Sequence, residues 1–221
     1  MIQSYKETFA YRSLALFTAL ALAFAPVAFA CDDELDPTPC VANNTTIQVL
    51  TNSHTTLTEA LNVGKRDTLR IEVLDALGDV CPTCAATIQT SSITNNGTID
   101  TVGFLALIAN TIINNGAINV TGDLLLANAG IDKAAFLAGV AELARNPNAA
   151  PGSILNTGQI NNLTKGIIAL LGSEGGVHNF GTIISDGGAV ALVAGNEISM
   201  PLTMDGLISI NIEKGAEISA P

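Results

Sequence analysis

The sequence lacks tryptophan, and aromatic residues make up only 4% of its 221 positions. A core formed by this chain must therefore be aliphatic. Charge is also scarce: charged residues make up 13%, and nine Lys and Arg stand against twenty Asp and Glu, for a formal net charge of −11. Because a phosphate backbone is bound by clustered basic side chains, we expect no nucleic-acid partner.

The residues that are abundant favour β-structure. Hydrophobic residues make up 48% of the chain, 20 residues are glycine, and valine, isoleucine, leucine, asparagine and threonine are frequent. This composition favours many short strands joined by turns over a helical bundle. The length is sufficient for one domain with a sizeable core.

Residues 1–30 have the sequence features of a secretory signal peptide. Lys6 and Arg12 precede an apolar run, and the segment ends in an Ala-x-Ala sequence at Ala28 and Ala30. We expect this segment to be removed and to leave no stable transmembrane segment, with a retained N-terminal anchor as the alternative. The chain is then secreted or placed on the bacterial cell surface by way of the periplasm.

Residues 31–45 are acidic and interrupted by proline, which is typical of a surface lead-in, and strands begin near residue 46. Four cysteines follow the cleavage site: Cys31, Cys40, Cys81 and Cys84. In an oxidising compartment three pairings of two disulfides are available. We predict the two bridges that are local in sequence, 31 with 40 and 81 with 84. Lipidation of the first cysteine, and a zinc or redox role for the last two, are the alternatives.

A short motif recurs along the chain with a period of about twenty residues. It reads aliphatic-x-Asn-x-Gly-x-Ile, and the fixed residue at every second position is typical of a strand with these residues on one side. A second element, Gly-x-aliphatic-x-Leu, follows each copy and begins at Gly103, Gly122, Gly166 or Gly188. The asparagines are Asn95, Asn114, Asn156 and Asn179, the glycines Gly97, Gly116, Gly158 and Gly181, and the isoleucines Ile99, Ile118, Ile160 and Ile183.

The spacing of these copies predicts a solenoid. Successive glycines lie 19 or 23 residues apart, except for one interval of 42, about two periods. A period of this length suits one coil of a parallel β-helix, in which equivalent strands lie about 4.8 Å apart along the axis. Equivalent positions then stack, so we predict a ladder of the four asparagines with side-chain amides bonded up and down, and columns of aliphatic residues.

The long interval contains a segment of different character. Residues 131–146 predict a short amphipathic α-helix, with Asp132 as N-cap and an apolar stripe of Phe136, Val140 and Leu143. We expect this helix to be an insertion that lies against the flank of the stack with the phenylalanine facing inward.

An enzymatic β-helix is the rival interpretation. It would need acids or bases that converge, but the acidic residues near the repeats do not recur in one phase, and the two histidines, His54 and His178, are isolated. We therefore expect no catalytic residue, no metal site and no cofactor. The acids are Asp100, Asp123, Glu174, Asp186, Glu197 and Asp205.

Residues 153–212 carry three motifs in a fixed order: the N-x-G-x-I turn, a G-x-V-A-L strand and a closing D-G-L-hydrophobic-S element. In this order the segment resembles the filamentous haemagglutinin-type N-terminal domain of two-partner secretion exoproteins. The similarity continues more thinly upstream through GFLALIANTIINNGAI.

The resemblance implies a right-handed parallel β-helix over residues 46–221. It implies recognition of the unfolded chain by an outer-membrane β-barrel transporter, folding outside the cell, and a non-enzymatic role in secretion and adhesion or haemagglutination, with a glycan or protein of a host cell or other surface as receptor. A carbohydrate-active β-helix enzyme such as a polysaccharide lyase, and a truncated structural fragment without a transporter, are the alternatives.

Overall fold

The computed structural model describes residues 44–128, 130–131, 140–144, 152–173, 175–195, 197–201 and 211–214. The predicted signal peptide, nearly all of the lead-in, and the first two cysteines lie outside these residues. Within them the chain is all-β, and most strands belong to two parallel sheets that alternate along the sequence.

One sheet has six parallel strands that follow one another in chain order. Its last four strands each begin directly after a predicted turn glycine, where the alternating pattern resumes. Its strands are β1 (Thr45–Leu50), β4 (Thr68–Leu74), β6 (Thr98–Val102), β8 (Ala117–Thr121), β13 (Gln159–Asn162) and β16 (Thr182–Ser185).

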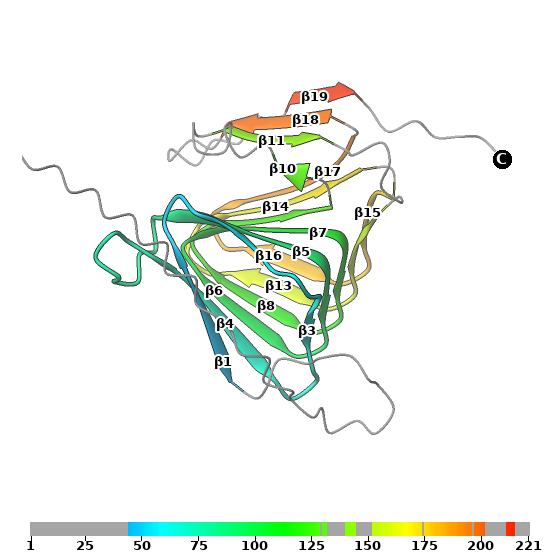
Figure 1. The fold of residues 1–221 in the computed structure, drawn as a ribbon. Helices are drawn as coiled ribbons and strands as arrows, with labels where there is room; N and C mark the ends of the chain where they lie inside the picture. The colour runs from blue at the N-terminus through cyan, green and yellow to red at the C-terminus, as the bar shows by residue number, and fades with distance from the viewer. Residues whose placement is uncertain are drawn as a thin grey trace, which may run out of the picture.

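The nine-stranded sheet covers two faces, because β5 (Ala85–Asn95) and β7 (Phe104–Asn114) are long enough to span both. Their first halves stack with β2 (His54–Thr56), β9 (Leu124–Ala127), β14 (Ile167–Gly172) and β17 (Ala189–Ala194). Their second halves stack with β3 (Leu61–Val63), β12 (Ile154–Asn156) and β15 (Val177–Asn179). Figure 1 shows the resulting three-sided coils. This arrangement is consistent with a parallel β-helix.

The register places equivalent residues of successive coils directly beside one another. Ile99 pairs with Ile118, Ile118 with Ile160, and Ile160 with Ile183. The first three are buried and the last, in the final coil described, is only partly buried. The predicted stacking of aliphatic columns is confirmed, and burial of each such side chain contributes about 1.5–3 kcal/mol.

A second apolar cluster lies on the other side of the nine-stranded sheet. It explains why β7, β9 and β14 contain continuous apolar runs, since both of their faces are covered. Ile198, in β18 (Glu197–Pro201), packs against this cluster. The cluster contains Ala106, Ile108, Leu125, Ala127, Ala169 and Leu171.

The strand β18 belongs to a separate antiparallel sheet, in the order β10 (Gly130–Ile131), β11 (Val140–Ala144), β18 and β19 (Asn211–Lys214). Figure 1 shows this sheet above the side of the stack that contains β14 and β17. Its position agrees with the contact that Ile198 makes.

The predicted helix over residues 131–146 is wrong where the structure describes the segment. Residues 140–144 form β11, and Leu143 pairs with Ile198 of β18, more than fifty residues later. Whether an amphipathic segment forms a helix or a strand depends on its tertiary contacts as well as on its intrinsic propensity. Here the segment pairs with a strand that is distant in the sequence. Phe136 and the predicted N-cap lie outside the described residues.

Candidate functional site: the asparagine and glycine corner

The four predicted asparagines occupy one corner of the stack, at the ends of β5, β7, β12 and β15. Asn95 Nδ2 donates to Asn114 Oδ1 at 2.7 Å, and Asn114 Nδ2 donates to Asn156 Oδ1 at 2.7 Å. Asn156 Nδ2 donates in the same way to Asn179 Oδ1 at 2.7 Å. Every donor points toward the next coil, so the ladder has one direction along the axis. The first three asparagines are buried and Asn179 is exposed.

These amides also satisfy the backbone at the bend. Asn95 Nδ2 donates to the carbonyl oxygen of Ala117 at 2.9 Å, and Asn114 Nδ2 donates to that of Gln159 at 3.2 Å. The backbone N–H of Gly97 donates to Asn95 Oδ1 at 3.1 Å. A buried bend leaves backbone groups without strand partners, and unpaired groups there are costly. The corner asparagines therefore hold the coils together.

The predicted turn glycines stack beside the asparagines with no room for a side chain. A Cβ added to Gly116 would lie 2.0 Å from the carbonyl oxygen of Gly97, and one added to Gly158 would lie 2.0 Å from that of Gly116. A Cβ on Gly181 would lie 2.1 Å from the carbonyl oxygen of Gly158. The first coil supplies a further member, Gly64, which the repeat motif does not identify because no Asn-x-Gly-x-Ile surrounds it.

The glycine column forms the floor of an open groove of about 470 Å³ on the outside of this corner. Three successive coils each contribute a glycine to the floor and one residue on either side of it, and these flanking residues form two walls. No lining residue carries a charge. One wall is formed by Asn115, Thr157 and Phe180, and the other by Ala117, Gln159 and Thr182. The sequence analysis did not identify this groove, although outward residues flanking a column of glycines are its signal.

Hydrogen bonds along the first wall order its side chains. Asn115 Nδ2 donates to Asn96 Oδ1 at 2.9 Å, and Thr157 Oγ1 donates to Asn115 Oδ1 at 2.7 Å. The next position along this wall is Phe180, which is 79% exposed. The wall thus changes from polar to aromatic at the final coil described.

Two further buried asparagines also form hydrogen bonds with backbone groups at bends of the stack, and they were not predicted. Asn128 Nδ2 donates to the carbonyl oxygen of Gly152 at 2.6 Å, and Asn128 Oδ1 accepts from the N–H of Ser173 at 2.6 Å. Asn162 Nδ2 donates to the carbonyl oxygen of Gly122 at 2.6 Å. Neither lies in an Asn-x-Gly-x-Ile motif, so the repeat gives no signal for them.

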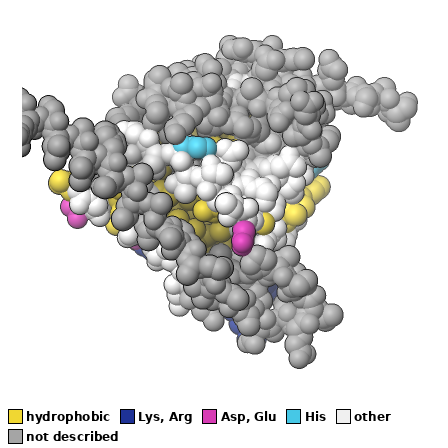
Figure 2. Space-filling view, in the orientation of Figure 1, with side chains coloured by type: hydrophobic (Ala, Val, Ile, Leu, Met, Phe, Trp, Pro, Cys, Tyr) yellow, Lys and Arg dark blue, Asp and Glu magenta, His cyan; other side chains and the backbone are white. Residues whose placement is uncertain are grey.

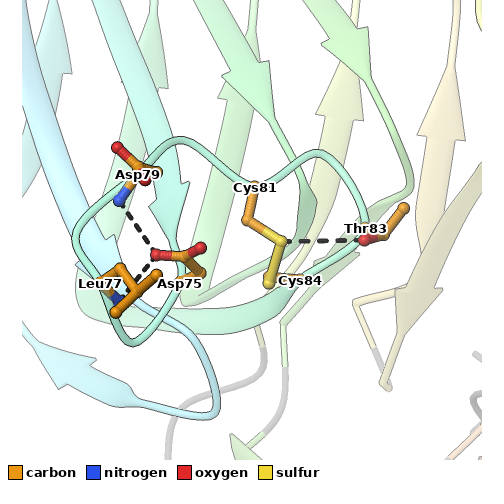
Figure 3. The surroundings of a disulfide bond; sticks show 6 residues. All are labelled: Asp75, Leu77, Asp79, Cys81, Thr83 and Cys84. Atoms are coloured by element: carbon orange, nitrogen blue, oxygen red, sulfur yellow. Dashed lines mark hydrogen bonds between the residues drawn. A yellow bond between two sulfur atoms is a disulfide. The ribbon is translucent and has the colours of Figure 1, made fainter.

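The predicted disulfide between Cys81 and Cys84 is present, with Cα atoms 5.3 Å apart (Figure 3). It lies in the loop between β4 and β5. The same loop is held by Asp75 Oδ1, which accepts from the N–H of Leu77 at 2.8 Å and from that of Asp79 at 3.0 Å. These bonds satisfy a tight turn locally, as Asp side chains commonly do.

One carboxylate on the six-stranded sheet is distinctly stabilised in its charged form. Arg70 Nε donates to Glu72 Oε1 at 2.6 Å, and Gln48 Nε2 donates to Glu72 Oε2 at 3.1 Å. The hydrogen bond from Arg70, and then that from Gln48, hold the pKa of Glu72 below its ordinary 4.5 against the opposing effect of burial. This cluster stabilises neighbouring strands β1 and β4.

The other ionisable residues considered from the sequence are dispersed. Asp100 Oδ1 accepts from Asn119 Nδ2 at 2.9 Å, and Asp123 Oδ1 accepts from the N–H of Ile167 at 2.7 Å. His178 is exposed, with Nε2 2.9 Å from the carbonyl oxygen of Gly175. Glu174, Asp205 and the side chain of Glu197 lie outside the described residues. Among the residues that can be described, no three His, Cys, Asp or Glu side chains gather as for a metal ion.

Charged side chains are sparse on the face of the molecule seen in Figure 2, where the described acidic and basic residues lie as isolated points. Within the part of the chain that the structure describes, no helix is long and apolar enough to span a membrane. No family model, curated protein or solved structure matches the chain.

Proposed function

We propose that this protein is a secreted, non-enzymatic module of the two-partner type, which serves export and surface adhesion. In this proposal the chain passes through the periplasm unfolded, is recognised by an outer-membrane β-barrel transporter, and folds outside as a right-handed parallel β-helix. The motif order N-x-G-x-I, G-x-V-A-L and D-G-L-hydrophobic-S over residues 153–212 supports the proposal.

The one-directional asparagine ladder is the observation that carries it. Each rung is completed by the following coil, since Asn95 donates to Asn114 and Asn114 donates to Asn156. Coils that depend mainly on their neighbours can form one after another, each on the surface of the last. A chain that emerges from a pore in sequence order can fold in this way, so that folding helps draw it outward.

The last coil described supports the same order of folding. Val190 is 42% exposed and Leu192 46% exposed, whereas Ile168 and Leu170, their partners one coil earlier, are buried. The inward columns therefore end in an apolar surface on which a following layer would gain burial. Growth by addition of coils is favoured at such a surface.

The test is release into the culture medium with and without a candidate two-partner transporter expressed in the same cells. Release that requires the transporter is expected, with periplasmic accumulation when the transporter is absent. The variant Gly158→Val, which blocks close approach to Gly116, should stall release, whereas the exposed Thr182→Ala should not. Release of the native chain that is indifferent to the transporter would remove the two-partner proposal and leave the fold unaffected.

A further inference from the structure

We propose that the groove above the glycine column binds a neutral, linear polysaccharide along the axis of the stack, with Phe180 as the platform for one sugar ring. The proposal rests on the adhesive part of the proposed function and names the chemistry of its receptor. It depends on the groove's form, its hydrogen-bonding groups and its one aromatic residue.

The form of the groove suits an extended chain. Its floor has no side chains, because Gly116, Gly158 and Gly181 are in backbone contact from coil to coil. Strands of neighbouring coils lie about 4.8 Å apart, so three coils place equivalent wall residues over about 10 Å. The wall positions therefore repeat in steps comparable to the length of a sugar unit, so successive units of a linear glycan can each meet one pair of wall residues.

The walls carry groups that recognise hydroxyls. Amides of Asn115 and Gln159 and hydroxyls of Thr157 and Thr182 line the groove, and together they supply both donors and acceptors. No lining residue carries a charge, so the groove offers nothing to offset removal of a charged sugar from water. The complement of this surface is an uncharged, hydroxyl-rich chain.

Phe180 supplies the apolar contact that polar walls alone lack. Its side chain is 79% exposed, and it is the one aromatic among the strongly exposed large hydrophobic residues that the structure describes. The face of an aromatic ring is electron-rich, which suits the polarised C–H groups on the flat side of a sugar. Sites for small or extended ligands typically combine one such apolar surface with a few directed polar groups.

A peptide that adds a strand is the less suitable occupant. Strand addition needs unpaired backbone groups, but the carbonyls of Gly116 and Gly158 in the floor already accept from the next coil. The N–H of Gln159 donates to the carbonyl oxygen of Gly116 at 2.8 Å, and that of Thr182 donates to that of Gly158 at 2.9 Å. Two floor carbonyls are thus paired within the stack, so recognition by the side chains of the walls is favoured over strand addition.

The test uses the full purified chain and isothermal titration calorimetry with cellohexaose, laminarihexaose and xylohexaose, and hexagalacturonate as the charged comparison. Binding of at least one neutral hexasaccharide, and at least tenfold weaker binding of hexagalacturonate, are expected. Phe180→Ala should weaken the neutral complex at least tenfold, Gln159→Ala should weaken it severalfold, and Phe180→Tyr should retain it. Leu163→Ala is the matched control, because Leu163 is 73% exposed and does not line the groove.

Three results would overturn the proposal: no binding of any neutral hexasaccharide, equal binding of the charged one, or unchanged binding by Phe180→Ala with an unchanged melting temperature. Because the purified chain is used, these outcomes are independent of export. Transporter-dependent release without glycan binding would remove the groove proposal alone. Glycan binding without transporter dependence would remove the export proposal alone.

Discussion

Asn114 and Asn156 are direct neighbours in the ladder, with the donor and acceptor 2.7 Å apart, although 42 residues separate them in sequence. Asn95 and Asn114 make the same contact across 19 residues. The longer interval therefore contains one coil and not two. The additional residues leave the stack after β9, contribute β10 and β11 to the outer sheet, and return at β12, which pairs with β7.

The ladder predicts an unequal cost of asparagine replacement along one column. Asn156→Leu removes the ladder acceptor of Asn114 Nδ2 and the donor to Asn179 Oδ1, so the free energy of unfolding should fall by about 1–3 kcal/mol. Asn179→Leu removes only the bond from Asn156 Nδ2, at a rung that is partly open to solvent, and should cost less. Urea unfolding followed by circular dichroism measures both, and equal stability of Asn156→Leu and the native chain would argue against the ladder.

Close backbone approach predicts that alanine is not tolerated at the central glycines. In Gly158→Ala the new Cβ would lie 2.0 Å from the carbonyl oxygen of Gly116, so two coils must separate. Overpacking of this kind costs about 1–3 kcal/mol, and more where the backbone must shift. The contact at Gly64 is instead with the carboxylate of Asp67, whose side chain can move, so Gly64→Ala should be milder. A thermal melt that ranks the two variants in the opposite order contradicts this account.

The sequence predicts the coils that contain the repeat well, because each of these coils carries its own local signal. Alternation of period two in Ile99, Gly97 and Asn95 fixes which side chains point inward, and repetition fixes the register between coils. The predicted disulfide of Cys81 and Cys84 is equally local. These features need no knowledge of contacts between distant parts of the chain.

The outer sheet could not be predicted in the same way. Val140 and Leu143 are spaced as on a helix, and their strand partners lie in residues 197–201, which nothing local identifies. Asn128 was missed for a related reason, since its partners, Gly152 and Ser173, lie 24 and 45 residues later in the sequence. An asparagine that bonds to neighbouring coils at a single place does not recur in the sequence, whereas the asparagines of the ladder recur with the period of the coil.

The interior column predicts a gradient of core stability toward the final coil. Leu170→Ala removes a buried side chain that pairs with Leu126 on one side and Leu192 on the other, and should cost about 2–5 kcal/mol. Leu192→Ala alters a side chain that is 46% exposed, so it removes less buried apolar surface than Leu170→Ala does. Its cost should be less than half as large. Equal decreases in the free energy of unfolding for the two variants, measured in urea, would indicate that the last coil is covered in solution.

Glu72 predicts a stability change in acid. Its folded-state pKa is lowered from 4.5, chiefly by the hydrogen bond from Arg70 and next by that from Gln48. A carboxyl with a lowered pKa stabilises the fold above its unfolded value, and this contribution is lost as the pH falls through the folded value. The melting temperature of the native chain should therefore exceed that of Glu72→Gln at pH 7, and the difference should shrink below about pH 4.5. Asp186→Asn, a change at an exposed turn, controls for removal of one negative charge. If the gap between the native chain and Glu72→Gln stays constant from pH 7 to pH 3, the bonds to Arg70 and Gln48 do not select the charged carboxylate.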